Sequence, residues 1–189
     1  MFSLPVKNVL VLSIVSAFVL AIGCGDPVLD DAITALGDEA SGVAPGPDHR
    51  PGQPCVLCHS KDGPASGSPF AVGGTIYATN ASNAPGAANI TVQFIDARGG
   101  APLVNPKTSK SGNFWVPTTD WPDIAFPLRV AIYDNPASAP TALMNSLIGR
   151  EGSCNFCHRA FYTGSNLSPD QIAANQSSQG PIYVKAGGS

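Results

Sequence analysis

Two short segments of the chain hold the residue types best suited to chemistry. The pattern Cys-x-x-Cys-His occurs at residues 55–59, the first motif, and again at residues 154–158, the second motif. This spacing is typical of c-type haem attachment, in which two thiols bond to one haem edge and the following histidine binds the iron. The sequence therefore predicts two covalently bound haem c groups. The residues expected to hold them are Cys55, Cys58, His59, Cys154, Cys157 and His158.

Two other uses are open to four cysteines in this pattern. Paired Cys-x-x-Cys segments can form a Cys₄ zinc site, or each pair can close a disulfide. The histidines favour haem, because the chain has only 3 histidines and two of them directly follow the cysteine pairs. Neither a Cys₄ zinc site nor a disulfide requires a histidine at that position.

The second axial ligand of each iron must come from elsewhere in the chain. The usual ligands are His or Met, and outside the motifs and the N-terminal leader the chain has one of each, His49 and Met144. We expect both to bind iron, with either haem as the partner of each. The alternatives are an unliganded loop histidine and a methionine that only fills the core. In a strand at 141–147, alternation places Leu143 and Leu147 on one face and Met144 on the other, away from the core.

The N-terminus has the pattern of a bacterial lipoprotein signal. Lys7 precedes an apolar run at residues 9–22, which is shorter than the ~20 residues of a spanning helix. The run leads into Ala21-Ile22-Gly23-Cys24, which resembles the bacterial lipobox, where the chain is cleaved before the cysteine and the cysteine is acylated. A plain signal peptide or an uncleaved anchor is the alternative. We expect Cys24 to carry the lipid. An Asp directly after the lipidated cysteine often favours retention in the inner membrane, and this chain has Gly25 there, which favours an outer-membrane lipoprotein.

Composition excludes some function classes. Charged residues are 12% of the chain and the net charge is −3, so no basic face is available for nucleic acid. The 20 glycines and 18 prolines among 189 residues argue against a helical bundle, and 43% hydrophobic residues argue against disorder. The sequence has no Ser-His-Asp set and no phosphate-binding glycine loop, so we expect no catalytic residues.

Between the motifs, the pattern predicts mainly β structure. Alternating apolar residues are separated by turn signals rich in Gly, Asn, Asp and Pro. The expected strands lie at 72–78, 90–96, 102–108, 113–117, 127–133 and 141–147, with a further one at 181–184. Such short strands favour a small antiparallel β-sandwich, with the two haem-binding loops flanking it. An even number of strands returns the chain to the pole where it entered, so both haems are expected at one end.

The β region resembles the carboxypeptidase regulatory-like, transthyretin-like family. The matching pieces are Gly74-Thr75-Ile76-Tyr77, Ile90 to Asp96 with Gly99, and Thr108 to Phe114. The resemblance implies an Ig-like sandwich that acts as a structural spacer and has no catalysis of its own.

The chain as a whole resembles a group of bacterial dihaem c-type cytochrome lipoproteins with one motif on each side of such a sandwich. The matching pieces are His49 to Gln53, Phe126-Pro127, and Met144 upstream of Gly152 to Asn155. The resemblance implies a membrane-anchored carrier that relays electrons between other redox proteins of the cell envelope. The alternative is a small haem oxidoreductase of the peroxidase-like kind, or a haem-based sensor, with one open iron site.

The predicted layout has five parts. In the linker at residues 24–54, Asp26 and Pro27 begin either a short helix or a disordered stalk. In the C-terminal tail, Ser168 to Gln171 has a capping-box pattern. The parts are a signal peptide at 1–23, a lipid-anchored linker at 24–54, the first haem-binding segment at 55–69, the β-sandwich at 70–147, and the second haem-binding segment with the C-terminal tail at 148–189.

Overall fold

The computed structural model describes residues 26–39, 41–81, 83–99, 102–161 and 165–185. The predicted signal peptide and the lipidation site Cys24 lie outside these residues. By its contacts the chain divides after Ala35 into a short N-terminal unit and a larger unit that begins at Leu36. Within the described residues, no helix has the length and apolar character needed to cross a bilayer.

The N-terminal unit contains one described helix, α2, at Pro27–Thr34. The Asp26 side chain caps it by accepting hydrogen bonds from the backbone N–H groups of Val28 and Leu29 at 3.0 and 3.2 Å. Pro27 occupies the first turn, where a missing N–H costs nothing. The sequence left a helix and a disordered stalk open, and the structure has the helix.

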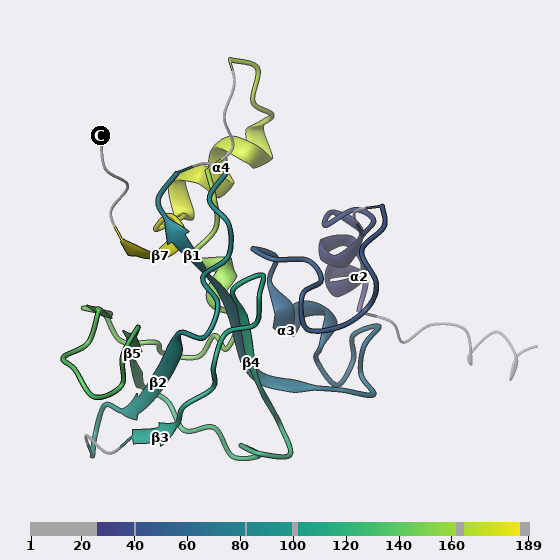
Figure 1. Ribbon diagram of the computed structural model, residues 1–189. Coiled ribbons are helices and arrows are strands. Elements are labelled where there is room, and N and C mark those ends of the chain that lie inside the picture. The colour runs from purple at the N-terminus through teal and green to yellow at the C-terminus, as the bar shows by residue number, and fades with distance from the viewer. Residues whose placement is uncertain (1–25, 40, 82, 100–101, 162–164, 186–189) are drawn as a thin grey trace, which may run out of the picture. The chain divides into compact units, whose positions relative to one another are not determined.

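The larger unit is mainly β structure in two small sheets (Figure 1). One has the strand order β4-β1-β7 and the other β3-β2-β5-β6. Their bounds are β1 Phe70–Thr79, β2 Thr91–Asp96, β3 Pro102–Val104, β4 Asn113–Pro117, β5 Leu128–Tyr133, β6 Ala142–Leu143 and β7 Ile182–Lys185. All pairs are antiparallel except β1 with β7, which is parallel. This pair departs from the wholly antiparallel sandwich predicted, because the chain reaches β7 through a long connection and not a tight turn.

One apolar core joins the two sheets. Alternation along the strands turns one face of each sheet inward. The apolar side chains that are at most 1% exposed are Val72, Ile76 and Phe114 from one sheet and Val92, Phe94, Leu128 and Ala131 from the other. The rings of Phe94 and Phe114 meet between the sheets with their centroids 6.2 Å apart. The larger unit is therefore a small β-sandwich-like fold, which confirms the coarse prediction.

All six strands predicted between the motifs are present, and two of them are shorter than predicted by more than one residue. The stretch 102–108 gives only β3, because Pro106 has no N–H to continue the ladder. The stretch 141–147 gives only the two residues of β6, although the Met144 N–H still bonds to the Val130 carbonyl at 2.9 Å.

The predicted orientation of Met144 is wrong. Leu143 and Leu147 are 48% and 49% exposed, whereas Met144 is half-buried. Regular alternation ends with β6, so the two-residue period cannot be extended through residue 147. The exposure of Leu143 and Leu147 therefore removes the reason to place Met144 on the side away from the core.

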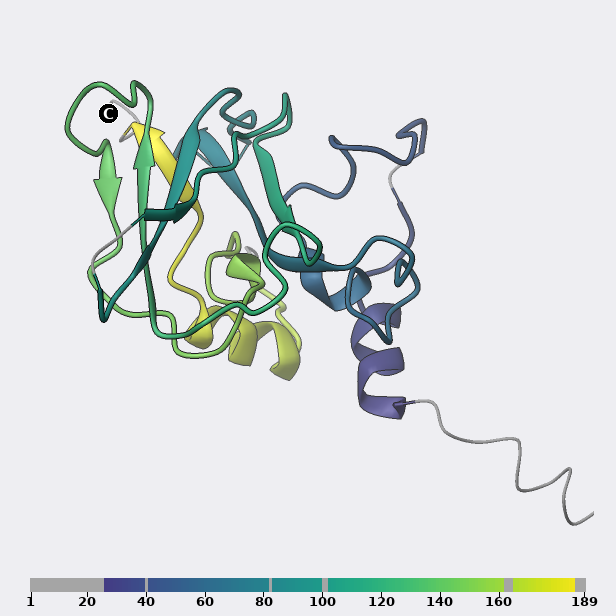
Figure 2. The same cartoon turned by 90° about the horizontal axis from the view of Figure 1, so that it is seen from below.

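Three short helices complete the larger unit: α3 at Cys55–Cys58, the 3₁₀ turn η1 at Cys154–Phe156, and α4 at Pro169–Ser177. The predicted capping box is present at α4. The Ser168 side chain accepts from the Gln171 N–H, and the Gln171 side chain accepts from the Ser168 N–H. In Figure 2, α4 runs beside the green η1 turn.

Candidate functional site

Each motif forms a single helical turn. In the first, the His59 N–H donates to the Cys55 carbonyl at 3.0 Å, and in the second the His158 N–H donates to the Cys154 carbonyl at 2.9 Å. Residues three and four positions apart share one side of a helical turn. The fold therefore places both thiols and the imidazole of each motif on a common side.

Both motifs meet the same short stretch of β1. A Cβ atom added at Gly73 would lie 3.0 Å from Cβ of Cys55, and one added at Gly74 would lie 2.8 Å from Cβ of Cys154. Successive residues of a strand face opposite sides of its sheet. The first motif therefore covers the outer face of β1, and Cys154 lies on the core face. The two glycines let both cysteines approach the strand closely.

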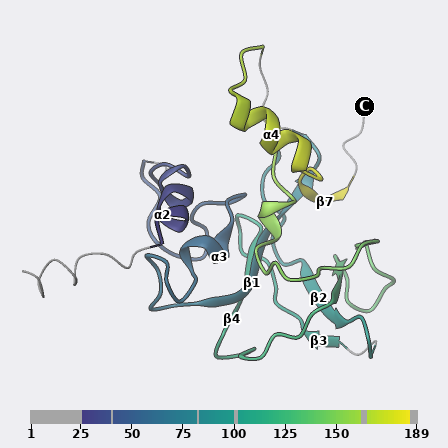
Figure 3. The same ribbon diagram turned by 180° about the vertical axis from the view of Figure 1, so that it is seen from behind.

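The second motif also occupies an edge of β1. The Gly73 N–H donates to the Gly152 carbonyl at 2.9 Å, and Gly73 forms a parallel bridge with Ser153. Farther along the same strand β7 takes over as the neighbour, starting with the pair Ile76 and Ile182. Figure 3 shows the η1 turn, in green, between α4 and β1. The structure thus places the two motifs at neighbouring residues of β1, and the position of both haems at one end of the sandwich stays a prediction.

The three histidines share one hydrogen-bonding arrangement. In each, Nδ1 lies against a backbone carbonyl oxygen, which accepts only, so Nδ1 must carry the proton. The pairs are His59 with Ser68 at 2.8 Å, His158 with Gly180 at 3.1 Å, and His49 with Gly46. Histidines that bind metals usually donate their second N–H in this way, which fixes the tautomer and the ring orientation. In a neutral imidazole of this tautomer, Nε2 is the nitrogen that can bind a metal.

His49 and His59 lie close together. Their ring centroids are 5.9 Å apart and their planes are inclined by 50°. Phe70 stacks on His59 with the ring centroids 3.9 Å apart, and the centroids of Phe70 and Trp115 are 5.9 Å apart. Burial lowers the pKa of His59, against the opposing effect of the Ser68 carbonyl, so the imidazole is kept neutral. The structure therefore brings His49 to the first motif.

A cavity of about 620 Å³ opens beside the first motif. Its volume is within the roughly 300–1,000 Å³ typical of ligand and cofactor pockets. Cys55, Cys58, His59 and His49 all line it. The other walls are largely apolar and include Leu36, Pro45, Pro54, Phe70 and Trp115.

Arg50 is the cationic residue among the walls of this cavity. It pairs with Glu39 at 3.3 Å and donates to the Gln53 side chain at 2.8 Å and to the Gly37 carbonyl at 2.9 Å. These contacts fasten the segment before the first motif.

The second motif is held by the C-terminal segment. The Gln179 N–H donates to the Cys157 carbonyl at 2.6 Å, and the Ser178 hydroxyl donates to the Arg159 carbonyl at 2.7 Å. The Arg159 guanidinium donates to the Ala174 carbonyl at the end of α4. The segment from α4 to β7 therefore sets the position of His158.

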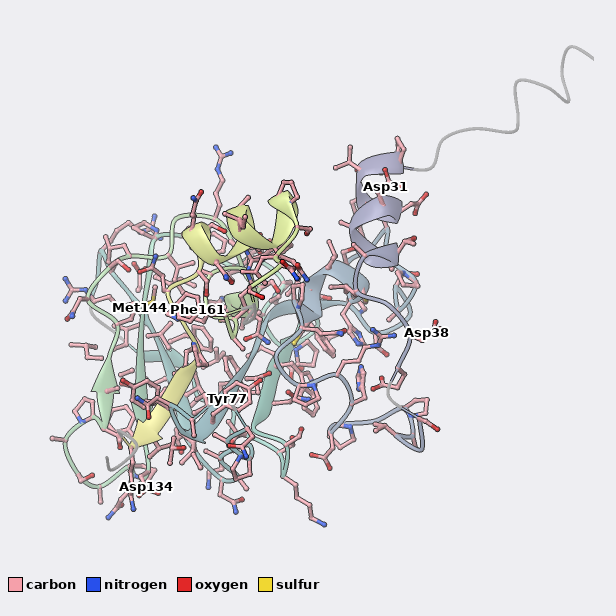
Figure 4. The ribbon with its side chains drawn as sticks, turned by 90° about the horizontal axis from the view of Figure 1, so that it is seen from above. Asp31, Asp38, Tyr77, Asp134, Met144 and Phe161 are labelled. Carbon is pink, nitrogen blue, oxygen red and sulfur yellow. The ribbon has the colours of Figure 1, made fainter. Side chains whose placement is uncertain are left out.

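Met144 does not line the cavity of the first motif. Figure 4 shows it beside the four-stranded sheet, whereas α3 lies on the other side of that view. The structure thus unites His49 with the first motif and does not do so for Met144. The role of Met144 as an iron ligand stays a prediction.

All four motif cysteines are free thiols. Burial raises the pKa of Cys154 to about 12, with Cys55 nearby adding to the effect, and burial raises the pKa of Cys55 to about 11. Burial also raises the pKa of Cys58, although Arg50 opposes it. Cys157 is exposed. In the described part of the chain, no three His, Cys, Asp or Glu side chains are gathered to hold a metal ion directly.

These environments predict an order of thiol reactivity in the haem-free protein. At pH 8 a thiol with a pKa of about 12 is roughly 1 part in 10⁴ thiolate, and thiolate is the nucleophile. We expect iodoacetamide to label Cys157 first and Cys154 last, with the Cys154 rate rising about tenfold per pH unit. Peptide mass spectrometry of timed samples measures the order. In urea the four rates should converge, and equal rates in the folded protein would contradict the described burial.

The two glycines of β1 give a second prediction. Gly74→Ala places a Cβ 2.8 Å from Cβ of Cys154 and 2.9 Å from Cζ of Phe114. Overpacking of this kind costs about 1–3 kcal/mol, and denaturant unfolding measures the loss. Gly149→Ala is the control, because an added Cβ there meets nothing within 4 Å. Equal stability of the two variants would show that β1 and the second motif are not in close contact.

Several residues that build the site escape detection from sequence. The carbonyls of Ser68 and Gly180 carry no side-chain signal. Trp115 does carry one, because it alternates with the inward residues Phe114 and Val116 and must therefore face outward. A large outward aromatic on a strand indicates that another segment or a ligand covers it.

Comparisons of the chain with protein-family models, with curated proteins and with solved structures gave no match.

Proposed function

We propose that the chain is a membrane-anchored dihaem c-type cytochrome that relays electrons between redox partners in the cell envelope. The observation that carries the proposal is the matching geometry of the two motifs. Each places two thiols and a histidine on one side of a helical turn, with Nδ1 held by a backbone carbonyl and Nε2 as the nitrogen that can bind a metal. Haem iron supplies a one-electron ferrous–ferric couple when bound.

At the first site, Cys55 and Cys58 would attach the haem, and His59 and His49 would bind its iron. The ring centroids of His49 and His59 lie 5.9 Å apart, so both imidazoles would be available to the same iron. The apolar cavity that these four residues line supports the same assignment.

At the second site, Cys154 and Cys157 would attach the haem and His158 would bind its iron. With His49 near the first motif, Met144 is the remaining ligand of the usual types for this iron. Unequal ligation would give the two haems different potentials, because Met/His ligation raises the potential.

Attachment needs no oxidant. In each case the S–H bond of a cysteine would break, sulfur would bond to one carbon of a vinyl group, and the hydrogen would go to the other carbon. The free thiols of the motifs provide the reduced form that this addition requires.

The rest of the chain would serve to place the two haems. The β region, a carboxypeptidase regulatory-like sandwich in this proposal, holds the two motifs at neighbouring residues of β1, which favours transfer between the haems. A lipid on Cys24 would tether the carrier to the outer membrane, where its partners are other redox proteins.

Spin state tests the carrier role. We expect electron paramagnetic resonance of the oxidised protein to show two low-spin haems, and a redox titration to show two reversible one-electron steps. A substantial high-spin population in the intact protein would contradict full axial ligation and would favour the peroxidase-like or sensor reading.

A further inference from the structure

A buried hydrogen-bond chain connects the two motifs. Asn155, between the two cysteines of the second motif, is 1% exposed. Its amide nitrogen donates to the Gln53 carbonyl at 2.8 Å and to the Thr75 hydroxyl at 3.1 Å, and its oxygen accepts from the Thr75 N–H at 3.2 Å. Gln53 lies two residues before the first motif. The Asn155 side chain of the second motif therefore holds the backbone segment that leads into the first motif.

The same chain continues to the backbone of His49. The Thr75 hydroxyl accepts from the Gly52 N–H at 2.8 Å and donates to the Asn113 side-chain oxygen at 2.8 Å. The Asn113 amide nitrogen donates to the carbonyls of His49 at 2.8 Å and Pro47 at 3.2 Å. Thr75 and Asn113 are partners in the β1–β4 register, so the sheet fixes the centre of this network.

The loop that carries His49 has no regular structure of its own, so contacts to other segments hold its shape, among them those of Arg50 and the hydrogen bond from the Ser111 N–H to the Asp48 side chain at 3.0 Å. Residues 46–53 contain turns and no regular element. Positive φ angles occur at Gly46, Arg50 and Gly52. Such a segment keeps one conformation only when outside contacts determine it. The network adds contacts from β1, β4 and the second motif to the others that hold this loop.

We propose that Thr75, Asn113 and Asn155 are positioning residues for the first haem, so that the second motif helps to hold His49 in place as a ligand. The inference rests on the proposed function and deepens it. The proposal predicts that loss of the buried Thr75 hydroxyl changes the ligation of the first iron. This hydroxyl bonds to Gly52, Asn113 and Asn155 and to no cysteine or histidine side chain of either motif.

The test uses Thr75→Val, which keeps the shape of the side chain and removes its hydroxyl. The Gly52 N–H and the Asn155 amide then lose a partner inside the protein, which is costly for buried groups. We expect the full-length haem-loaded variant to bind up to one more equivalent of CO per chain than the wild type, in the reduced state. We also expect amide exchange at Gly52 to rise by about tenfold.

Two matched variants control for general destabilisation. Thr108→Val removes another buried threonine hydroxyl, which accepts from the Ile90 N–H and donates to the Ala87 carbonyl away from both motifs. It should bind no more CO than the wild type. Thr75→Ser keeps the hydroxyl and should restore wild-type CO binding.

Each result decides the proposal. Extra CO binding in Thr75→Val alone, with rescue by Thr75→Ser, supports it. Two low-spin haems in the wild type together with equal CO binding in Thr75→Val and Thr108→Val would overturn this inference and leave the proposed function standing. A wild type without haem would overturn both.

Discussion

Replacing Cys58 with Ala is expected to lower the covalent haem content from two per chain to one, and replacing Cys157 with Ala is expected to do the same at the other motif. Each change removes one of the two thiols that a motif offers to a haem edge. A variant with both Cys55→Ala and Cys58→Ala has no thiol left in the first motif and should carry haem at the second only. Haem staining of denatured protein and the pyridine haemochrome spectrum measure the content.

The sandwich should stay folded in these variants. The first motif packs outside the core, and the second contributes only the partly buried Cys154 to its border. Far-ultraviolet circular dichroism of Cys58→Ala and Cys157→Ala should therefore match the wild type. Covalent haem still at the first motif in the variant with both Cys55→Ala and Cys58→Ala, or zinc in place of haem in the wild type, would refute the assignment of the motifs.

Replacing His49 with Ala is expected to leave the first iron with His59 as its only protein ligand and to convert that haem to high spin. The reason is the 5.9 Å separation of the two rings and the lack of a second His or Met side chain among the described walls of the cavity. Electron paramagnetic resonance should show one high-spin and one low-spin haem per chain.

His49→Met is the conservative partner of this change. A thioether keeps the iron six-coordinate and should raise the potential of the first haem by on the order of 100 mV, within the roughly 0.8 V that axial ligands span. Met144→Ala should leave the signal of the first haem unchanged and alter that of the second. A His49→Ala spectrum identical to that of the wild type would show that His49 is not a ligand.

The strand positions were accessible from sequence because they depend on local patterns. Alternation and turn residues are short-range signals, and they placed every strand from β1 to β6. The same signals failed at residues 143–147, where an edge strand of two residues ends and alternation no longer reports burial. The parallel partner of β1 also depends on a long connection that no local pattern describes.

The candidate site was accessible only in part for the same reason. Both motifs are local in sequence, so their cysteines and histidines could be named without a structure. Their meeting at Gly73 and Gly74, and the role of Asn155 between them, depend on contacts between residues about 80 to 100 positions apart. A buried Asn inside a motif looks like any variable residue until its partners are known.

The intact mass of the wild-type chain under denaturing acid shows whether both motifs carry covalent haem. These conditions release haem that is held only by iron ligands and leave thioether bonds in place. We expect a single species that is heavier than the polypeptide, with its lipid if retained, by the mass of two haems. A mass without any haem, in protein expressed with an active haem-attachment system, would contradict this expectation.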